Sequence, residues 1–302
     1  MLSLEIAALG GHSELFIHLT SKVSSELCGF QELAIVPALV HKVPMLKGVK
    51  ADNDCDKFPL TGRFLMGRLR HAMTGDEKAL VEGIVREVRV LADGEVLVRR
   101  GVQTNLCSIL IEGFMIRTVE MEGHRSIVSM QVPGDFVDLH AFALRRLDHD
   151  LVALGNCKVG VVEHTAIAEV LEHRPHLARL LWFSTLLDAA IHREWICKLE
   201  QLQAAARVAH IFSEIWHRLD MVGLSSQGVV RTPLTQANLA EMCGITPIHM
   251  NRALGQLRRE GIADFRRGTL YVEDRARLEA FGAFNPFYLY GEYVLPALSE
   301  AR

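Results

Sequence analysis

The chain has 302 residues, of which 49% are hydrophobic and 23% charged, and a formal net charge of −3. This composition excludes a disordered or low-complexity polymer, and the length suits two domains with substantial cores. No stretch approaches 18 uncharged apolar residues, which argues against a membrane partner, and no basic segment precedes an apolar run at the N-terminus. A cytoplasmic location is therefore the default expectation.

The first part of the chain, residues 1–58, is predicted as a poorly defined N-terminal extension, because its periodicity is weak and a polar linker covers residues 50–57. The sequence Thr74-Gly75-Asp76-Glu77 then has the spacing of a capping box, with a hydroxyl three residues before a carboxylate. It predicts the start of a helix that leads into the next domain.

Residues 59–173 are predicted as a jelly-roll effector or sensor domain. Turn signals such as Asp93-Gly94, Glu112-Gly113, Pro133-Gly134 and Gly155-Asn156 separate short apolar or alternating runs, which is typical of an antiparallel β barrel. Such a barrel can hold one small ligand or be filled by its own side chains, and the sequence leaves both open. The predicted strands are Val88–Leu91, Glu95–Arg99, Cys107–Ile111, Phe114–Glu120, Ser126–Gln131, Leu151–Leu154 and Lys158–Val162.

Residues 174–202 are predicted as one long dimerisation helix that begins at Pro175. It carries two apolar lines where a surface helix needs one. The second line favours contact with a partner subunit, although burial of both lines inside one large monomer is the alternative. The first line is Leu177, Leu181, Ser184, Leu187, Ile191 and Trp195, and the second is Trp182, Leu186, Ala189, Ala190 and Ile196.

Residues 203–285 are predicted as a winged helix-turn-helix domain, followed by a tail at 286–302. Two short amphipathic helices between Leu234 and Arg259 are joined at Gly244, and Thr235 and Thr246 stand where side-chain oxygens cap helix starts. The second helix is expected to face outward with polar and branched side chains that can reach base edges or phosphates: Ile248, His249, Asn251, Arg252, Gln256 and Arg259.

A basic hairpin is expected after the second helix. Ile262 to Val272 reads as two short strands around a tip that carries Arg266 and Arg267. This locally positive surface on an acidic chain is typical of phosphate binding, and it predicts double-stranded DNA as a partner. An ordinary helical hairpin with a solvated polar face is the alternative explanation of the motif.

The ordered set of these motifs resembles the Crp/Fnr family of bacterial transcription regulators. The resemblance covers about residues 60–285 and implies an α+β protein: an antiparallel β jelly roll of the cyclic-nucleotide-binding type, a long dimerisation helix and a C-terminal winged helix-turn-helix. It also implies a homodimer on a palindromic operator, with RNA polymerase as a further partner. By analogy Arg252 contacts a guanine, Gln236 and Thr246 contact phosphates, and Asn251 and Ile248 face bases.

Two departures from the family pattern change these expectations. Many members have a glutamate where this chain has Ile248, so the preferred half-site should tolerate change at that base pair or favour a thymine methyl group. Cyclic-nucleotide-binding members have Gly-Glu-Leu and Arg-Ser segments, whereas this chain reads Val137-Asp138-Leu139-His140 and then Asp148-His149-Asp150. A cyclic phosphate would be repelled there, unless Arg145 or Arg146 substitutes for the missing arginine. The effector is left unassigned.

Two other classes of function stay open as alternatives: a metal-dependent jelly-roll enzyme, and a regulatory subunit whose helix-turn-helix does not bind DNA. The sequence has no His-x-His spacing of a metal-binding cupin and no phosphate loop or nucleophile elbow. No enzyme activity, metal or cofactor is therefore predicted. The histidines and cysteines in question are scattered: His124, His140, His149, His164, Cys28, Cys55, Cys107, Cys157, Cys197 and Cys243.

Overall fold

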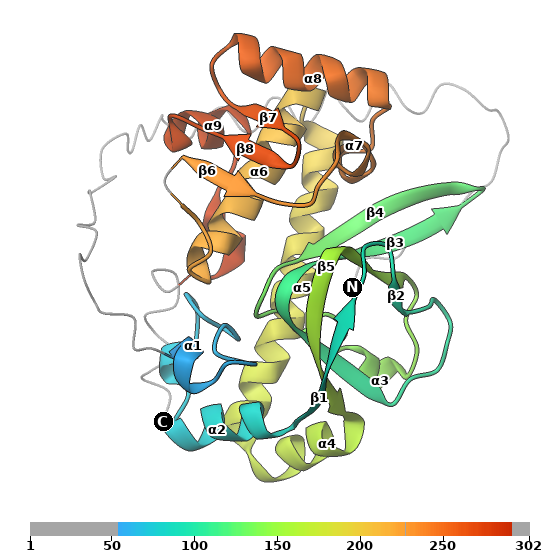
Figure 1. The fold of residues 1–302 in the computed structure, drawn as a ribbon, viewed down its shortest axis with the longest axis vertical. Helices are drawn as coiled ribbons and strands as arrows, with labels where there is room; N and C mark the ends of the chain where they lie inside the picture. The colour runs from blue at the N-terminus through green and yellow to red at the C-terminus, as the bar shows by residue number, and fades with distance from the viewer. Residues whose placement is uncertain (1–53, 227, 292–302) are drawn as a thin grey trace, which may run out of the picture. The chain divides into compact units, whose positions relative to one another are not determined.

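The computed structural model describes residues 54–226 and 228–291 (Figure 1). Most of the predicted extension, residues 1–53, and Tyr293 of the predicted tail lie outside the described residues. The described chain begins with helix α1 (Asp54–Lys57), a 3-10 turn η1 (Arg70–Ala72) and helix α2 (Gly75–Gly83). None of the described helices is long and apolar enough to cross a lipid bilayer.

The predicted capping box at the start of α2 is confirmed. The Thr74 hydroxyl accepts a hydrogen bond from the Glu77 backbone N–H (3.2 Å), and the Glu77 carboxylate accepts one from the Thr74 N–H (2.9 Å). The two residues thereby satisfy donors that a helix start leaves without an intrahelical partner.

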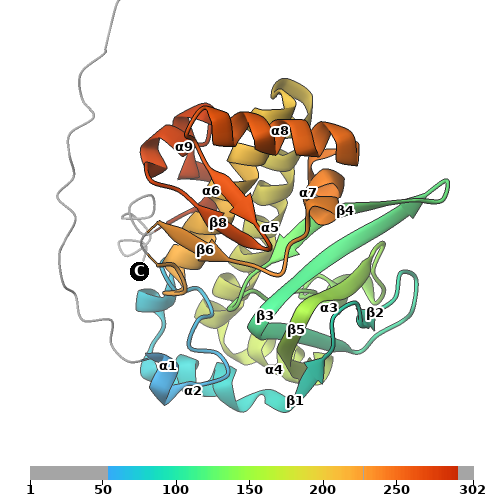
Figure 2. The same cartoon turned by 45° about the horizontal axis from the view of Figure 1, so that its top comes forward.

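An antiparallel sheet forms the first domain, as predicted. Its path is β1 (Val85–Leu91), β5 (Asp150–Glu163), β3 (Leu106–Met121) and β4 (His124–Gln131), and β2 (Val96–Val98) also pairs with β5. The small helix α3 (Ala141–Leu144) lies between β4 and β5. Strands β3 and β4 form a long hairpin; β4 passes beside α7, and the tip of the hairpin projects beyond that helix (Figure 2).

Two of the predicted turns are wrong. The structure has one strand, β3, across Glu112-Gly113, and one strand, β5, across Gly155-Asn156. The pairing register of β3 with β5 shifts on both sides of Glu112, so the glycine there forms a β-bulge rather than a turn. Gly113 has φ +83°, and a Cβ on it would lie 2.6 Å from Cys157 Cβ on the facing strand. A local glycine signal is the same for a bulge and for a turn, and only the partner strand distinguishes them.

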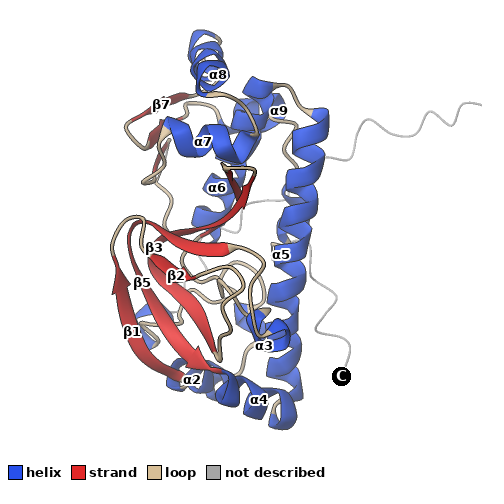
Figure 3. Ribbon diagram, turned by 90° about the vertical axis from the view of Figure 1, so that its right-hand side faces the viewer, coloured by secondary structure: helices blue, strands red, loops and turns tan. Residues whose placement is uncertain are grey.

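Helices α4 (His164–His173) and α5 (Pro175–Gln201) follow the sheet. Helix α5 runs alongside the sheet and continues to the C-terminal helices (Figure 3). Its buried face contains Leu177, Leu181, Leu187, Ile191 and Trp195, which confirms the first apolar line apart from the half-buried Ser184. From the second line, Trp182, Leu186, Ala189 and Ile196 are exposed and Ala190 is buried.

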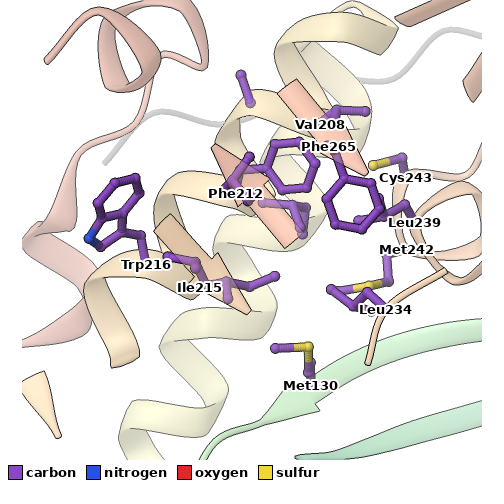
Figure 4. Packing of buried hydrophobic residues seen from close by; sticks show 14 of the residues in the cluster. Met130, Val208, Phe212, Ile215, Trp216, Leu234, Leu239, Met242, Cys243 and Phe265 are labelled. Atoms are coloured by element: carbon purple, nitrogen blue, oxygen red, sulfur yellow. The ribbon is translucent and has the colours of Figure 1, made fainter. Parts of the chain in front are cut away.

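The C-terminal domain packs around helix α6 (Ala204–Met221). Phe212 of α6 lies against Phe265, with ring centroids 5.3 Å apart, and Met242 and Leu239 are buried in the same cluster (Figure 4). Met130 of β4 belongs to this cluster, so one apolar core joins the sheet to the DNA-binding fold. The other elements are β6 (Val229–Arg231), α7 (Gln236–Cys243), α8 (Pro247–Arg259), β7 (Asp264–Arg266), β8 (Thr269–Tyr271), α9 (Arg275–Phe281) and η2 (Pro286–Leu289).

The aromatic segment near the C-terminus packs on α5 and α6. The Tyr288 hydroxyl donates to the Glu214 carboxylate (2.8 Å), and Trp195 Nε1 donates to the same carboxylate (2.9 Å). Glu214 is 1% exposed, and Arg218 lies 3.2 Å from it. Because a buried carboxylate is stable only with such donors, this cluster fixes the end of the described chain to both helices.

Candidate nucleic-acid interface

The helix-turn-helix is formed by α7 and α8, and the turn depends on Gly244. Gly244 has φ +60° and ψ +40°, a left-handed conformation that glycine adopts without strain. The inner faces of both helices are buried, including Leu239, Met242, Leu254 and Leu257. The predicted apolar stripes and the predicted turn are therefore confirmed as structure.

Both helix starts carry the predicted threonine caps. Thr235 accepts from the Asn238 N–H (3.1 Å) in a reciprocal capping box that the sequence analysis did not identify, because asparagine replaces the usual glutamate. Thr246 accepts from the His249 N–H (3.3 Å), and its hydroxyl lies 2.9 Å from His249 Nδ1. An anion is favoured at such helix starts, because the N–H groups of the first turn have no partner within the helix.

The structure places the predicted DNA-contacting side chains on one exposed surface. Helix α8 lies at the outer edge of the described chain, with α7 and the β7–β8 hairpin beside it (Figures 1 and 2). Ile248 is 67% exposed, so its branched side chain lies on this surface rather than in the core. The exposed residues are Gln236, Thr246, Ile248, His249, Asn251, Arg252, Arg266 and Arg267.

The wing is a β7–β8 hairpin whose two-residue tip is Arg267-Gly268. Both residues have positive φ, +48° and +78°, which is the geometry of a type I′ turn. The hairpin joins a third strand, β6, which the sequence analysis missed because a three-residue strand carries little periodic signal. A groove of about 650 Å³ separates the hairpin tip from the start of α7, and its lining includes Gln236, Arg258, Arg266 and Arg267.

One carboxylate organises two of these arginines. Asp264 in β7 accepts from Arg258 Nε of α8 (2.8 Å) and lies 2.5 Å from Arg266 Nη2 of the wing. Burial alone raises the pKa of Asp264, but hydrogen bonds and charges from both arginines hold it below its ordinary value. Asp264 thus braces the wing against α8, a role that only the folded chain reveals.

The same domain is held to the sheet by a surface ion pair. Arg125, next to the tip of the β3–β4 hairpin, donates from Nε and Nη2 to the two carboxylate oxygens of Glu241 in α7, at 3.0 and 2.9 Å. The bulge residue Gly155 also lies close to Pro233, which precedes α7. The helix-turn-helix therefore docks on the sheet through charge as well as through the shared core.

In the first domain, the segment between Val137 and Asp150 carries several buried side chains, including Leu139, Leu147 and His149. Asp138 is buried and accepts from the Ser108 N–H (2.5 Å), and burial raises the pKa of Asp138 to about 7. Arg117 of β3 crosses this region, donating to the Val137 carbonyl (2.7 Å) and to Asp188 of α5 (2.5 Å). The sequence analysis did not identify Arg117 or Asp188, because 71 residues separate them.

The loop arginine considered as a substitute phosphate clamp has another position. Arg145 caps α3 in a left-handed conformation (φ +63°), and its guanidinium lies 3.0 Å from His164 Nδ1. His140 and His149 have ring centroids 5.5 Å apart, and burial lowers the pKa of His140 to about 4. Across the described residues, no group of three or more His, Cys, Asp or Glu side chains has a geometry that could hold a metal ion.

Comparison with known proteins gives two family matches in the order of the observed domains. The cyclic nucleotide-binding domain matches residues 88–174, and the Crp-like helix-turn-helix domain matches residues 206–281. The chain is 25% identical over 246 residues to the transcriptional activator protein FnrL of Cereibacter sphaeroides, covering 79% of this chain and 94% of FnrL. It is 24% identical over 203 residues to the nitrogen fixation regulation protein FixK of Bradyrhizobium diazoefficiens, covering 67% of this chain and 84% of FixK.

Solved structures share the fold. The structure of FixK2 from Bradyrhizobium japonicum matches with a TM-score of 0.59 at 20% identity, covering 65% of this chain and 96% of FixK2. A transcriptional regulator of the CRP/FNR family from Thermus thermophilus matches with a TM-score of 0.52 at 19% identity, covering 65% of this chain and 98% of that regulator. With both domain matches, the relatives and the exposed helix-turn-helix in agreement, the chain belongs to the Crp/Fnr family of transcription regulators.

Proposed function

We propose that this protein binds a palindromic DNA operator as a homodimer, and that it does so without a cyclic nucleotide. The observation that carries the proposal is the exposed face of α8 beside a basic wing. Arg252 has a side chain that can grip a guanine in a bidentate fork, and Asn251, Ile248 and His249 flank it. Gln236 and Thr246, at the starts of α7 and α8, would contact phosphates.

Dimerisation is supported by the outer face of α5. Trp182, Leu186 and Ile196 are 66%, 52% and 65% exposed. Together with the exposed Ala189, they follow one another at spacings of four, three and seven residues, which places them on one face of the helix. A second copy of the same helix would cover this stripe in a two-fold arrangement. One α8 reads only a few base pairs, so two copies on a symmetrical site multiply affinity and specificity.

The charged side chains inside the first domain support independence from cyclic nucleotides. Arg117 donates through Nη1 to the Asp188 carboxylate, which neutralises its charge, and through Nη2 to the Val137 carbonyl. Its buried Nε has no hydrogen-bond partner among the described residues, but a cyclic phosphate would still have to displace Asp188 to gain the charge of Arg117. Asp138 adds a buried carboxyl group to the same region. The break between α5 and α6 at Leu202-Gln203 would act as the pivot through which any other signal reorients the DNA-binding domains. RNA polymerase is the expected partner at a promoter.

In vitro selection of random duplexes on the purified protein tests the proposal directly, with Arg252→Ala as the matched variant. We expect a palindromic consensus from the wild type, tolerance or a thymine at the base pair that faces Ile248, and loss of one guanine preference in Arg252→Ala. Binding to the selected duplex should weaken steeply with salt and should not respond to added cyclic AMP or cyclic GMP. Recovery of unrelated sequences, or an absolute need for a cyclic nucleotide, contradicts it.

A further inference from the structure

Helix α8 contains a glycine that the fold does not require. Among the described helices, Gly255 is the glycine that lies at neither the first nor the last helical position. Glycine in a helix interior is destabilising relative to alanine, because it loses more backbone freedom on folding. A glycine at such a position therefore calls for a reason outside helix formation.

The surroundings of Gly255 leave room for a side chain in the free protein. A Cβ built on Gly255 would lie 3.3 Å from Arg259 Nη1, the mobile end of a long side chain, and no other atom outside the local helix backbone is within 4 Å. Its φ is not positive, in contrast to Gly113 and Gly268, which have positive φ and close neighbours on other segments. Alanine would fit at position 255 without strain.

The position of Gly255 is the middle of the face proposed to meet DNA. Two of the proposed contact residues, Ile248 and Arg252, lie seven and three residues before Gly255, and Arg259 lies four residues after it. These spacings place all four positions on one line along the helix. The three side chains are exposed, whereas Met250 on the opposite side of α8 is fully buried. The exposed line thus has no side chain between the guanidinium groups of Arg252 and Arg259. Helix α8 itself lies at the outer edge of the described chain (Figure 2).

We infer that Gly255 is a DNA-contact position at which the backbone of α8 lies directly against one strand of the operator. The rise from Arg252 to Gly255 is about 4.5 Å, compared with about 3.4 Å between neighbouring base pairs, so a helix that lies along the groove places Gly255 one to two base pairs beyond Arg252. A side chain at position 255 would hold the helix away from the groove floor and lengthen the contacts of Arg252 and Arg259. This inference rests on the proposed function and names the residue that sets how deeply α8 inserts.

The test uses two properties that the inference moves in opposite directions. Gly255→Ala should raise Tm by about 2 °C, because alanine favours the helix. The same variant should bind the selected operator at least about tenfold more weakly, and Gly255→Leu should weaken binding further. Equal or tighter operator binding by Gly255→Ala overturns the inference, even where Tm rises.

Two controls separate the alternatives. Gly83→Ala, at the exposed last position of α2 with no atom within 4 Å of the added Cβ, should leave operator affinity unchanged. In an Arg259→Met background, Gly255→Ala should still weaken binding; if its effect disappears, the glycine only makes room for Arg259 and the inference is wrong. Absence of operator binding by the unaltered protein instead contradicts the proposed function, so the two failures are distinguishable.

Discussion

Arg117 Nη1 and Asp188 Oδ2 lie 2.5 Å apart and join the sheet to α5. The Arg117 side chain is 3% exposed and that of Asp188 is 29% exposed, so the cation is the more deeply buried partner. Burial alone raises the pKa of Asp188, but the neighbouring Arg117 holds it below its ordinary value. The pair ties the barrel loop at Val137 to the helix that we propose as the dimer contact.

Removing the carboxylate should destabilise the protein more than removing the cation. Asp188→Ala leaves a buried guanidinium without its partner and should lower the free energy of unfolding by about 3 kcal/mol. Arg117→Met leaves Asp188 in contact with water and should cost roughly half of that. Urea unfolding measures both, and equal losses would contradict the asymmetry.

The Arg117–Asp188 pair should make the stability of the protein depend on pH in the acid range. Since the folded pKa of Asp188 is below its unfolded value, its contribution is present above the unfolded pKa and is lost as the pH falls through the folded pKa. Unfolding curves of the wild type and Asp188→Asn should therefore converge in strong acid. A constant difference between them down to the lowest pH would show that the pair is not responsible.

Lys198 should be a destabilising residue at neutral pH. It is 1% exposed, its Nζ has no hydrogen-bond partner among the described residues, and it lies 3.8 Å from the centre of the Trp195 ring. Burial lowers the pKa of Lys198 to about 8, so the folded state binds fewer protons than the unfolded state between about pH 8 and 10.5. Stability should rise with pH across that window.

The matched variant is Lys198→Met, which keeps the length of the side chain and removes the charge. It should raise the free energy of unfolding at pH 7 by about 1 to 3 kcal/mol and abolish the rise between about pH 8 and 10.5. Unfolding measured at pH 7 and at several pH values between about 8 and 10.5 gives both quantities. A less stable Lys198→Met protein at neutral pH would mean that the contact with Trp195 outweighs desolvation.

The exposed stripe on α5 should control the oligomeric state. Leu186→Lys puts a charge on the proposed seam and should convert a dimer into a monomer at micromolar concentration, with at least about a hundredfold loss of operator affinity. Sedimentation velocity measures the mass. Leu171→Lys, at a 42% exposed position of α4, makes the same substitution elsewhere and should leave the mass unchanged; a wild type that is already monomeric refutes the role of α5.

The two classes of DNA contact should differ in salt dependence and specificity. Arg267→Ala, at the wing tip, should weaken binding to all duplexes by a similar factor and reduce the salt slope by about 1 for each protomer. Arg252→Ala should relax the preference for one base pair at a cost of about 1 to 3 kcal/mol. Binding assays with operator and scrambled duplexes separate the two, and a uniform loss from Arg252→Ala would assign it to phosphate instead.

The local elements were predictable from the sequence because their causes are local. The caps at Thr74, Thr235 and Thr246, the glycine turn at Gly244 and the apolar lines of α5 and α8 depend on residues within one or two helical turns of each other. The exposure of the proposed DNA-contacting residues follows from the same periodicity, which buries Met250 and turns Ile248 outward.

What only the tertiary structure decided depends on residues that lie far apart in the chain. The glycines at 113 and 155 form bulges because a partner strand faces them, and Arg117 and Glu214 acquire partners from distant parts of the chain only when separate elements pack together. The sequence identifies the side chains that carry charge. The energetic effect of a charge depends on its distance from other groups and on its burial, and both are properties of the folded chain.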